Sequence, residues 1–103
     1  MPLELRPNCE CCDKDLHPTV SDAMICTYEC TFCTKCVEDV LSNVCPNCGG
    51  GFVPRPIRPS KARRAGVSLN HQPASTKRRH TKYTIEELKA FANLAKDIPP
   101  SKR

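Results

Sequence analysis

The chain has 103 residues and no tryptophan, and its aromatic residues are limited to 3 Phe and 2 Tyr. No apolar run approaches the roughly 20 residues that a membrane-spanning helix needs, so we expect no transmembrane segment. The first ten residues contain no apolar stretch typical of a signal peptide, which favours a cytoplasmic protein. Catalytic triads, paired carboxylates and phosphate-binding loops are also missing from the sequence, and we therefore expect no enzyme.

Cysteine is abundant instead, with 9 residues, an odd number. Eight of them form four close pairs, which are Cys9 with Cys12, Cys26 with Cys30, Cys33 with Cys36, and Cys45 with Cys48. The short turn inside a CxxC pair directs two thiolates toward one metal ion. Close pairing and the odd count favour intracellular metal sites over a secreted disulfide scaffold.

The cysteine pairs lie in a small domain, residues 1–53, that has few apolar residues. A domain of this size rarely stabilises itself by core burial alone. A structural zinc site contributes about 10–16 kcal/mol in small peptides, which matches or exceeds the stability of about 5–15 kcal/mol of a typical domain. We therefore expect a small zinc-stabilised α+β fold that is unfolded without metal.

Two short elements are predicted inside this domain. Residues 23–27 are predicted to form half of a β-hairpin around the second cysteine pair. Residues 35–44 read as a helix, because Val37, Val40, Leu41 and Val44 repeat at i, i+3, i+4 and i+7. Gly49 follows the last pair, where a positive φ would turn backbone amides toward the sulfurs.

The order of the pairs, C-x2-C, C-x3-C, C-x2-C and C-x2-C, resembles a RING finger whose ligands are all cysteines. The resemblance implies a cross-brace with two Zn²⁺ ions. Cys9, Cys12, Cys33 and Cys36 would bind the first ion, and Cys26, Cys30, Cys45 and Cys48 the second. A sequential arrangement, in which Cys33, Cys36, Cys45 and Cys48 share one ion, is the alternative. Cys11 is the alternative to Cys12, although a CxxC is commoner than a CxC in zinc sites.

Three stretches carry a closer resemblance: LELRPNCECCDKDL from Leu3, ICTYECTFCTKC from Ile25 and CPNCGG from Cys45. They resemble a family of short bacterial cysteine-rich domains of unknown function. The resemblance covers about residues 1–57 and implies a RING-like zinc domain in a bacterial, cytoplasmic protein. It implies no activity.

The charge is divided between two halves of the chain. Residues 1–53 carry 3 basic and 8 acidic residues, whereas residues 54–103 carry 13 basic and 3 acidic residues. Residues 54–83 are rich in proline and basic side chains, which predicts a disordered linker. Residues 84–97 predict a short amphipathic helix, since Thr84 and Glu87 form a capping-box pattern. Residues 98–103 are expected to be a disordered end.

We favour a non-catalytic module that binds another protein. Its contact surface would be the helix face that carries Glu38 and Asp39, or the apolar stripe of Ile85, Leu88 and Phe91. Packing of that stripe against the cysteine-rich domain is an equally good interpretation.

The second hypothesis is sequence-independent nucleic-acid binding by the tail, because basic side chains neutralise phosphates. The candidate contacts are Arg55, Arg58, Lys61, Arg63, Arg64, Lys77, Arg78, Arg79 and Lys82. Tyr83 is the one aromatic residue near them, so base stacking is not indicated.

Three further hypotheses have less support. A ubiquitin-ligase function would need an aliphatic residue in the first CxxC, where this chain has Glu10 and Cys11, and often a basic residue after the last cysteine, where it has Gly49. A thioredoxin-like role of Cys33 and Cys36 lacks the βαβ context, although all-cysteine sites also bind iron. His17 is a possible substitute ligand.

Overall fold

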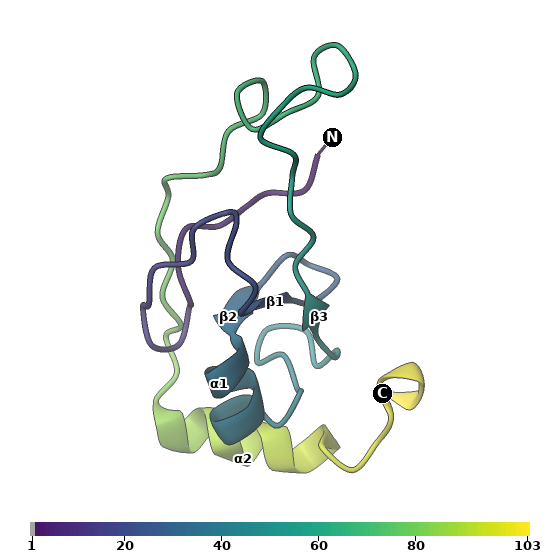
Figure 1. Cartoon of the computed structure of the whole chain (residues 1–103). Coiled ribbons are helices and arrows are strands. Elements are labelled where there is room, and N and C mark those ends of the chain that lie inside the picture. Colours follow the sequence, from purple (N-terminus) through teal and green to yellow (C-terminus); the bar gives the residue numbers. More distant parts are fainter. Residues whose placement is uncertain (1) are drawn as a thin grey trace.

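The computed structural model describes residues 2–103 and contains a small three-stranded antiparallel sheet with strand order β2-β1-β3 (Figure 1). Strands β1 (Ala23–Ile25) and β2 (Thr31–Cys33) pair with Met24 opposite Phe32, and β3 (Val53–Pro54) lies on the other side of β1. The predicted hairpin is therefore present. Its turn contains Cys26 and Cys30.

A short helix follows the hairpin directly. Helix α1 (Thr34–Cys36) continues into a π-helical turn, η1 (Val37–Leu41). The sequence predicted a helix that runs to residue 44, but this one ends at Leu41 because Ser42 and Asn43 adopt left-handed backbone angles, with φ of 48° and 59°. The helix face predicted from the apolar spacing still points inward, since Val37, Leu41 and Val44 are all buried.

Sulfur atoms form much of the hydrophobic core. The fully buried Phe32 meets Phe52 edge to face, with ring centroids 5.4 Å apart. Leu16 and Leu41 pack in the same cluster. Seven cysteines complete it, namely Cys9, Cys11, Cys26, Cys30, Cys33, Cys36 and Cys45. The fold is a small α+β domain whose interior is built as much from thiols as from hydrocarbon.

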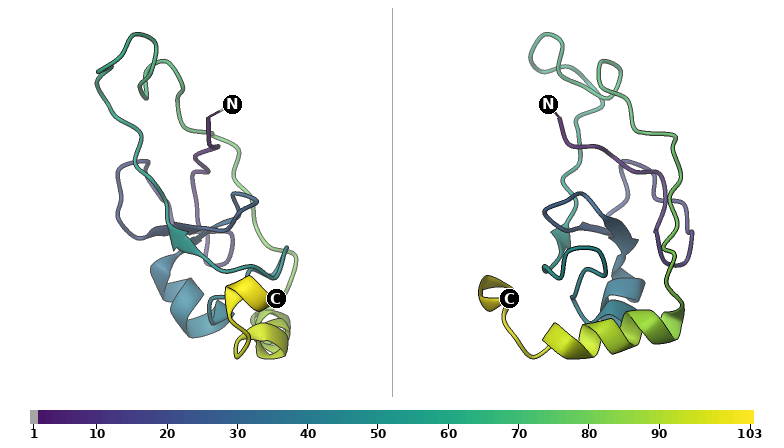
Figure 2. Two further views of the ribbon diagram at one scale, coloured as in Figure 1. Left: turned by 90° about the vertical axis from the view of Figure 1, so that its right-hand side faces the viewer. Right: turned by 180° about the vertical axis from the view of Figure 1, so that it is seen from behind.

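Helix α2 (Ile85–Ala95) packs on this core. Its predicted capping box is confirmed: the Glu87 amide donates to Thr84 Oγ1 at 3.2 Å, and the Thr84 amide donates to Glu87 Oε1 at 3.0 Å. Leu88 and Ala92 are buried, and α2 crosses beside η1 (Figures 1 and 2). A 3₁₀ turn, η2 (Pro100–Lys102), ends the chain. Leu88 of the predicted apolar stripe therefore packs on the cysteine-rich domain, whereas Ile85 and Phe91 stay 47% and 39% exposed.

The predicted disorder of residues 54–83 is not confirmed, because this segment is held by hydrogen bonds. Residues 72–82, which we call the strap, run beside the N-terminal segment. The Ser75 amide donates to the Leu5 carbonyl at 2.9 Å, and the Thr81 amide donates to the Glu10 carbonyl at 2.7 Å. The strap thereby connects the cysteine-rich domain to α2. The domain limits given above remain predictions.

Replacement of Leu88 by Ala tests whether α2 is part of the core. Leu88 is 1% exposed, and removal of a buried leucine side chain costs about 2–5 kcal/mol. We expect Leu88→Ala to lower the free energy of unfolding by an amount in this range in a denaturant titration of the metal-loaded protein.

Leu94→Ala is the matched control, because Leu94 lies on the same helix and is 74% exposed. We expect it to change stability by no more than about 0.5 kcal/mol. Equal effects of the two substitutions would show that α2 does not pack on the domain in solution.

Candidate metal centre

The first cysteine cluster joins two segments that are distant in the sequence. Cys9 and Cys12 lie in the loop before β1, Cys33 is the last residue of β2, and Cys36 ends α1. Their four Sγ atoms all lie within 4.8 Å of one another. The sulfurs of Cys12 and Cys33 are 3.8 Å apart.

This spacing fits a tetrahedral metal site. A Zn–S bond of 2.3 Å places two sulfurs of a regular tetrahedron about 3.8 Å apart. The observed Cys12–Cys33 separation of 3.8 Å matches that value. Four sulfur donors that converge from a loop, a strand and a helix could therefore hold one metal ion.

The loop that holds Cys9 and Cys12 has a tight backbone turn. The Asp13 amide donates to the Cys9 carbonyl at 2.8 Å, and the Cys9 amide donates to the Lys14 carbonyl at 2.8 Å. Asp13 takes φ of 63°, a left-handed angle that aspartate tolerates better than most residues. This turn brings both sulfurs to the same side of the loop.

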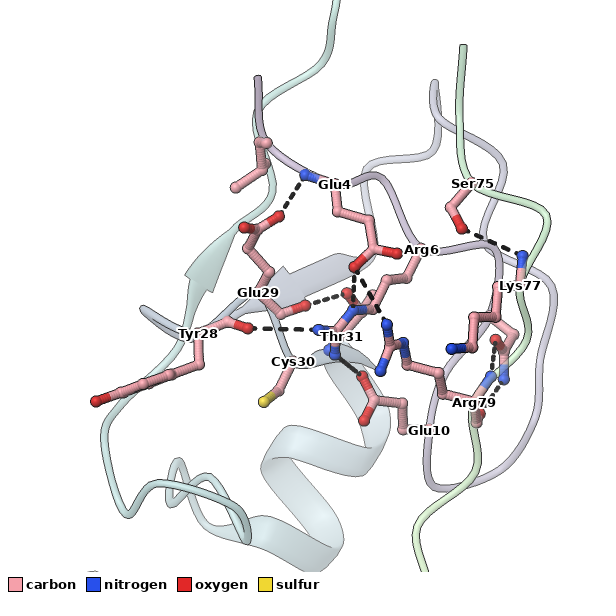
Figure 3. A network of polar contacts seen from close by, with 12 residues as sticks. Glu4, Arg6, Glu10, Tyr28, Glu29, Cys30, Thr31, Ser75, Lys77 and Arg79 are labelled. Atoms are coloured by element: carbon pink, nitrogen blue, oxygen red, sulfur yellow. Dashed lines mark hydrogen bonds and ion pairs between the residues drawn. The ribbon is translucent and has the colours of Figure 1, made fainter. Parts of the chain in front are cut away.

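A buried carboxylate fixes this loop against β2 (Figure 3). Glu10 Oε2 accepts from the Thr31 amide at 2.7 Å and from Arg6 Nη1 at 2.9 Å. The Glu10 amide in turn donates to the Thr31 carbonyl at 3.0 Å. Arg6 also donates to Glu4 at 3.0 Å. Glu10 therefore positions the first cysteine pair next to Cys33, a role that sequence reasoning missed because nothing local distinguishes this glutamate.

The second cluster contains Cys26, Cys45 and Cys48, whose Sγ atoms also lie within 4.8 Å of one another. Cys30 lies beside Cys26 and Cys45 but is not within this mutual distance of all three. The sulfurs come from the β1–β2 turn and from the loop after η1. This group could hold a second metal ion.

Backbone and amide N–H groups surround the second cluster. The Tyr28 amide lies 3.3 Å from Cys26 Sγ, the Gly50 amide lies 3.4 Å from Cys48 Sγ, and Asn47 Nδ2 lies 3.4 Å from Cys30 Sγ. Gly49 has φ of 79°, as its place after the last pair predicted. Such N–H donors stabilise thiolates, which are the form of cysteine that binds metals.

Burial and mutual contact shift the acidity of these thiols. Burial raises the pKa of Cys9 and of Cys26 to about 11, and it also raises the pKa of Cys36. Contact with the Cys45 thiol lowers the pKa of Cys30 to about 5, and the same contact raises the pKa of Cys45. A cation that enters either cluster must therefore displace protons from buried thiols.

Cys12, rather than Cys11, belongs to the first cluster. Cys11 is buried beside Cys36 but lies outside the group of four.

His17 is exposed, and its Nδ1 is 2.7 Å from Thr19 Oγ1. Cys33 and Cys36 join Cys9 and Cys12 and not Cys45 and Cys48, so the sequential arrangement is not the one found here.

The basic residues of the tail divide into two sets. Arg55 is buried and donates to the carbonyls of Arg6, Leu16 and His17, so it is removed from the predicted surface contacts. Arg58 donates to the carbonyls of Leu3 and Gln72 at 2.6 Å each. Arg78 pairs with Asp13 and Asp15, and Arg79 lies 3.6 Å from Glu4. These four arginines hold the tail against the N-terminal segment, Arg55 and Arg58 through backbone carbonyls and Arg78 and Arg79 through carboxylates.

The other predicted contacts remain on the surface. They are Lys61, Arg63, Arg64, Lys77 and Lys82, and all five are exposed. The Nζ atom of Lys82 also lies 5.5 Å from the centroid of the Tyr83 ring. Lys61, Arg63 and Arg64 lie together in the loop before the strap.

Residues 2–58 match a protein family described as "Protein of unknown function (DUF1272)". The chain belongs to this family. An uncharacterized protein of Rhizobium meliloti (strain 1021) is 58% identical over 76 residues, which are 74% of this chain and 83% of the relative. That similarity is longer than the family match, so part of it lies outside residues 2–58. No solved structure matches the chain.

The family match contains all nine cysteines and therefore both clusters, whereas the strap and α2 follow it. Between residues 2 and 103, no helix is both long and apolar enough to cross a membrane.

Serine substitutions of the adjacent Cys11 and Cys12 test the first cluster. We expect Cys12→Ser to lower the number of Co²⁺ ions bound per chain by one, with loss of the corresponding thiolate-to-cobalt absorption, because one of four sulfur donors is gone.

Cys11→Ser is expected to keep the full cobalt stoichiometry. If Cys11→Ser loses a cobalt ion and Cys12→Ser keeps it, then Cys11 is the ligand and Cys12 is not.

Proposed function

We propose that the protein is a non-catalytic zinc-binding module with two structural Zn²⁺ ions in a RING-like cross-brace, and that it acts by contact with another protein. The observation that carries this proposal is the alternation of the clusters, since the first and third cysteine pairs converge at one place and Cys26 of the second pair converges with the fourth pair at another. Clusters that alternate in this way connect the N-terminal loop and the loop after η1 to the small sheet, which does not itself pair with either loop.

The donor set favours zinc. Tetrahedral sites with four thiolates are typical of zinc or iron, and closed four-cysteine sites are commonly structural zinc sites. Cys30 is the fourth donor of the second site in this proposal, because its thiol contacts those of Cys26 and Cys45. All four positions of each ion are then filled by protein, which leaves no place for a substrate.

We infer a reducing compartment such as the cytoplasm, because cysteines bind a metal ion only while they stay unoxidised. A ubiquitin-ligase-like function has no support from the first CxxC, because its interior residues Glu10 and Cys11 are both buried and Glu10 is committed to the Thr31 amide.

A groove between α2 and the loop that carries Pro46 supports contact with a protein. It has a volume of about 450 Å³ and is lined by Pro46, Tyr83, Glu87, Phe91 and Leu94, among others. The large apolar side chains of Phe91 and Leu94 are exposed there. Glu86 and Glu87 give the first turn of α2 a negative charge. The occupant that fits best is an apolar helix of a partner protein with a basic side chain toward Glu87.

Native mass spectrometry with elemental analysis tests the metal content. We expect the freshly purified protein to contain two zinc ions per chain. Removal of zinc by a chelator should abolish the folded circular-dichroism spectrum, because the thiol-rich core has too little hydrocarbon to persist alone. One ion per chain, or iron, would contradict the two-zinc proposal.

The same proposal predicts a dependence on pH. Cys9 and Cys36 have raised pKa values in the metal-free state, so at least these two thiols of the first site release protons when zinc binds. Zinc affinity should therefore fall as the pH falls, by about 100-fold for each unit when two protons are released. A pH-independent affinity would show that the thiols are already ionised.

Leu94→Asp tests the groove. Because Leu94 is exposed, we expect the variant to keep its zinc content and thermal stability while it loses a partner protein that the wild type retains through cross-linking and purification. A partner that both proteins retain equally would place the contact elsewhere on the surface.

A further inference from the structure

The loop of residues 59–72 is separated from the acidic part of the molecule and is held in a defined shape. In all three views it lies at the end opposite α1 and α2 (Figures 1 and 2). The Leu69 amide donates to the Pro59 carbonyl at 2.9 Å, which closes the base of the loop. Arg58 donates to the Gln72 carbonyl from the preceding segment. We call residues 59–72 the basic loop.

Polar contacts around the buried Ser68 order the basic loop. Ser68 is fully buried, and its hydroxyl is 2.8 Å from His71 Nδ1. The Gln72 side chain donates to the Gly66 carbonyl at 2.9 Å and accepts from the Ser68 amide at 3.4 Å. Gly66 has φ of 79°, which favours glycine at this turn. A closed loop with such internal packing resembles an Ω-loop more than a flexible linker.

The cations of this loop are available to a ligand. Lys61, Arg63 and Arg64 are exposed, and among residues 2–103 none of their side chains has a hydrogen bond or an ion pair. Arg55, Arg58, Arg78 and Arg79 are in contrast occupied by carbonyls and carboxylates. No acidic residue lies between Asp39 and Glu86 in the sequence, so no neighbour along the chain neutralises the loop.

We propose that the basic loop is a binding surface for the phosphate backbone of duplex nucleic acid, with Lys61, Arg63 and Arg64 as the contacts. Guanidinium groups bind phosphate oxygens in a bidentate way, and two adjacent arginines with a lysine suit a repeated array of phosphates. Recognition is independent of sequence, because these contacts reach the backbone and not the bases.

Two observations favour a duplex over other polyanions. The basic loop contains no aromatic residue; Phe52 is buried in the core and Tyr83 lies at the α2 groove, so single strands have no stacking surface in this loop. Val67 is the one large apolar side chain that the loop exposes. Stable binding to a membrane surface needs a larger apolar face than this.

Fluorescence anisotropy of a labelled random-sequence DNA duplex with the intact zinc-loaded protein tests the proposal. The key variant replaces Lys61, Arg63 and Arg64 by Gln. The matched control replaces Lys89, Lys96 and Lys102 by Gln, because these exposed lysines lie at the α2 end and their loss removes the same three charges. Zinc content and the circular-dichroism spectrum verify that both variants are folded.

We expect the wild type to bind the duplex at low salt and the loop variant to bind at least tenfold more weakly. Three phosphate contacts contribute about −2.7 to the slope of log K against log salt, so a fourfold rise in salt weakens them about 40-fold. The loop variant should lose that part of the slope, and the control should retain it.

Equal losses in the two triple variants would overturn the proposal, because net charge alone would then explain binding. No duplex binding by the wild type would overturn it as well. A third outcome would also overturn it. If the wild type binds phosphatidylserine vesicles but no duplex, and the loop variant loses the vesicle binding, the ligand of the basic loop is an anionic lipid surface. Because the loop and the α2 groove are at opposite ends, failure here leaves the Leu94→Asp test unaffected.

Discussion

The packing of the domain depends on the convergence of cysteine pairs that are distant in the sequence. The sheet is small, with strands of two or three residues, and by itself it positions neither the N-terminal loop nor the loop after η1. The first loop meets β2 and α1 at Cys33 and Cys36, and the second meets the hairpin turn at Cys26. Seven of the nine cysteines are also core residues. The sulfur clusters therefore act both as candidate ligands and as the centre of packing.

Polar contacts set the positions that the sulfurs need. Glu10 is buried because it satisfies the Thr31 amide and the Arg6 guanidinium at the same time, and a buried carboxylate without such partners would be costly. Asn8 is equally buried and donates to the Arg79 carbonyl at 2.7 Å, while its own Oδ1 accepts from the Arg79 amide at 3.2 Å. The strap is thus bonded to the loop that carries Cys9 and Cys12. The same loop therefore carries half of the first cysteine cluster and an attachment point of the tail.

The two ends of the tail have different surroundings. Near the acidic domain, Arg78 pairs with Asp13 and Asp15, and Arg79 pairs with Glu4. These two arginines are therefore not free to bind an external anion. In the basic loop, Lys61, Arg63 and Arg64 have no such neighbours. The net charge of the tail therefore overstates the number of its cations that are free to meet an external anion. An apolar groove at α2 and a basic loop at the far end give the molecule two separate surfaces.

The sequence by itself determined the features that depend on near neighbours. The cysteine pairs, the hairpin, the capping box of Thr84 and Glu87 and the positive φ of Gly49 all follow from residues within a few positions of one another. The predicted helix over residues 35–44 is too long at its C-terminal end, because nothing in the residue types of Ser42 and Asn43 requires both to adopt left-handed backbone angles.

Only the tertiary structure decided the features that depend on distant contacts. Which cysteine pairs share a cluster, whether Leu88 is buried, and which arginines are free all depend on how the chain folds back on itself. The RING-like spacing implied the cysteine grouping only by resemblance, and the basic residues of the tail have similar sequence contexts. Arg78 is occupied because the chain returns it to Asp13 and Asp15, and Arg63 is free because the chain carries it away from them. The same side-chain chemistry thus serves structure in one place and leaves a charged surface in another.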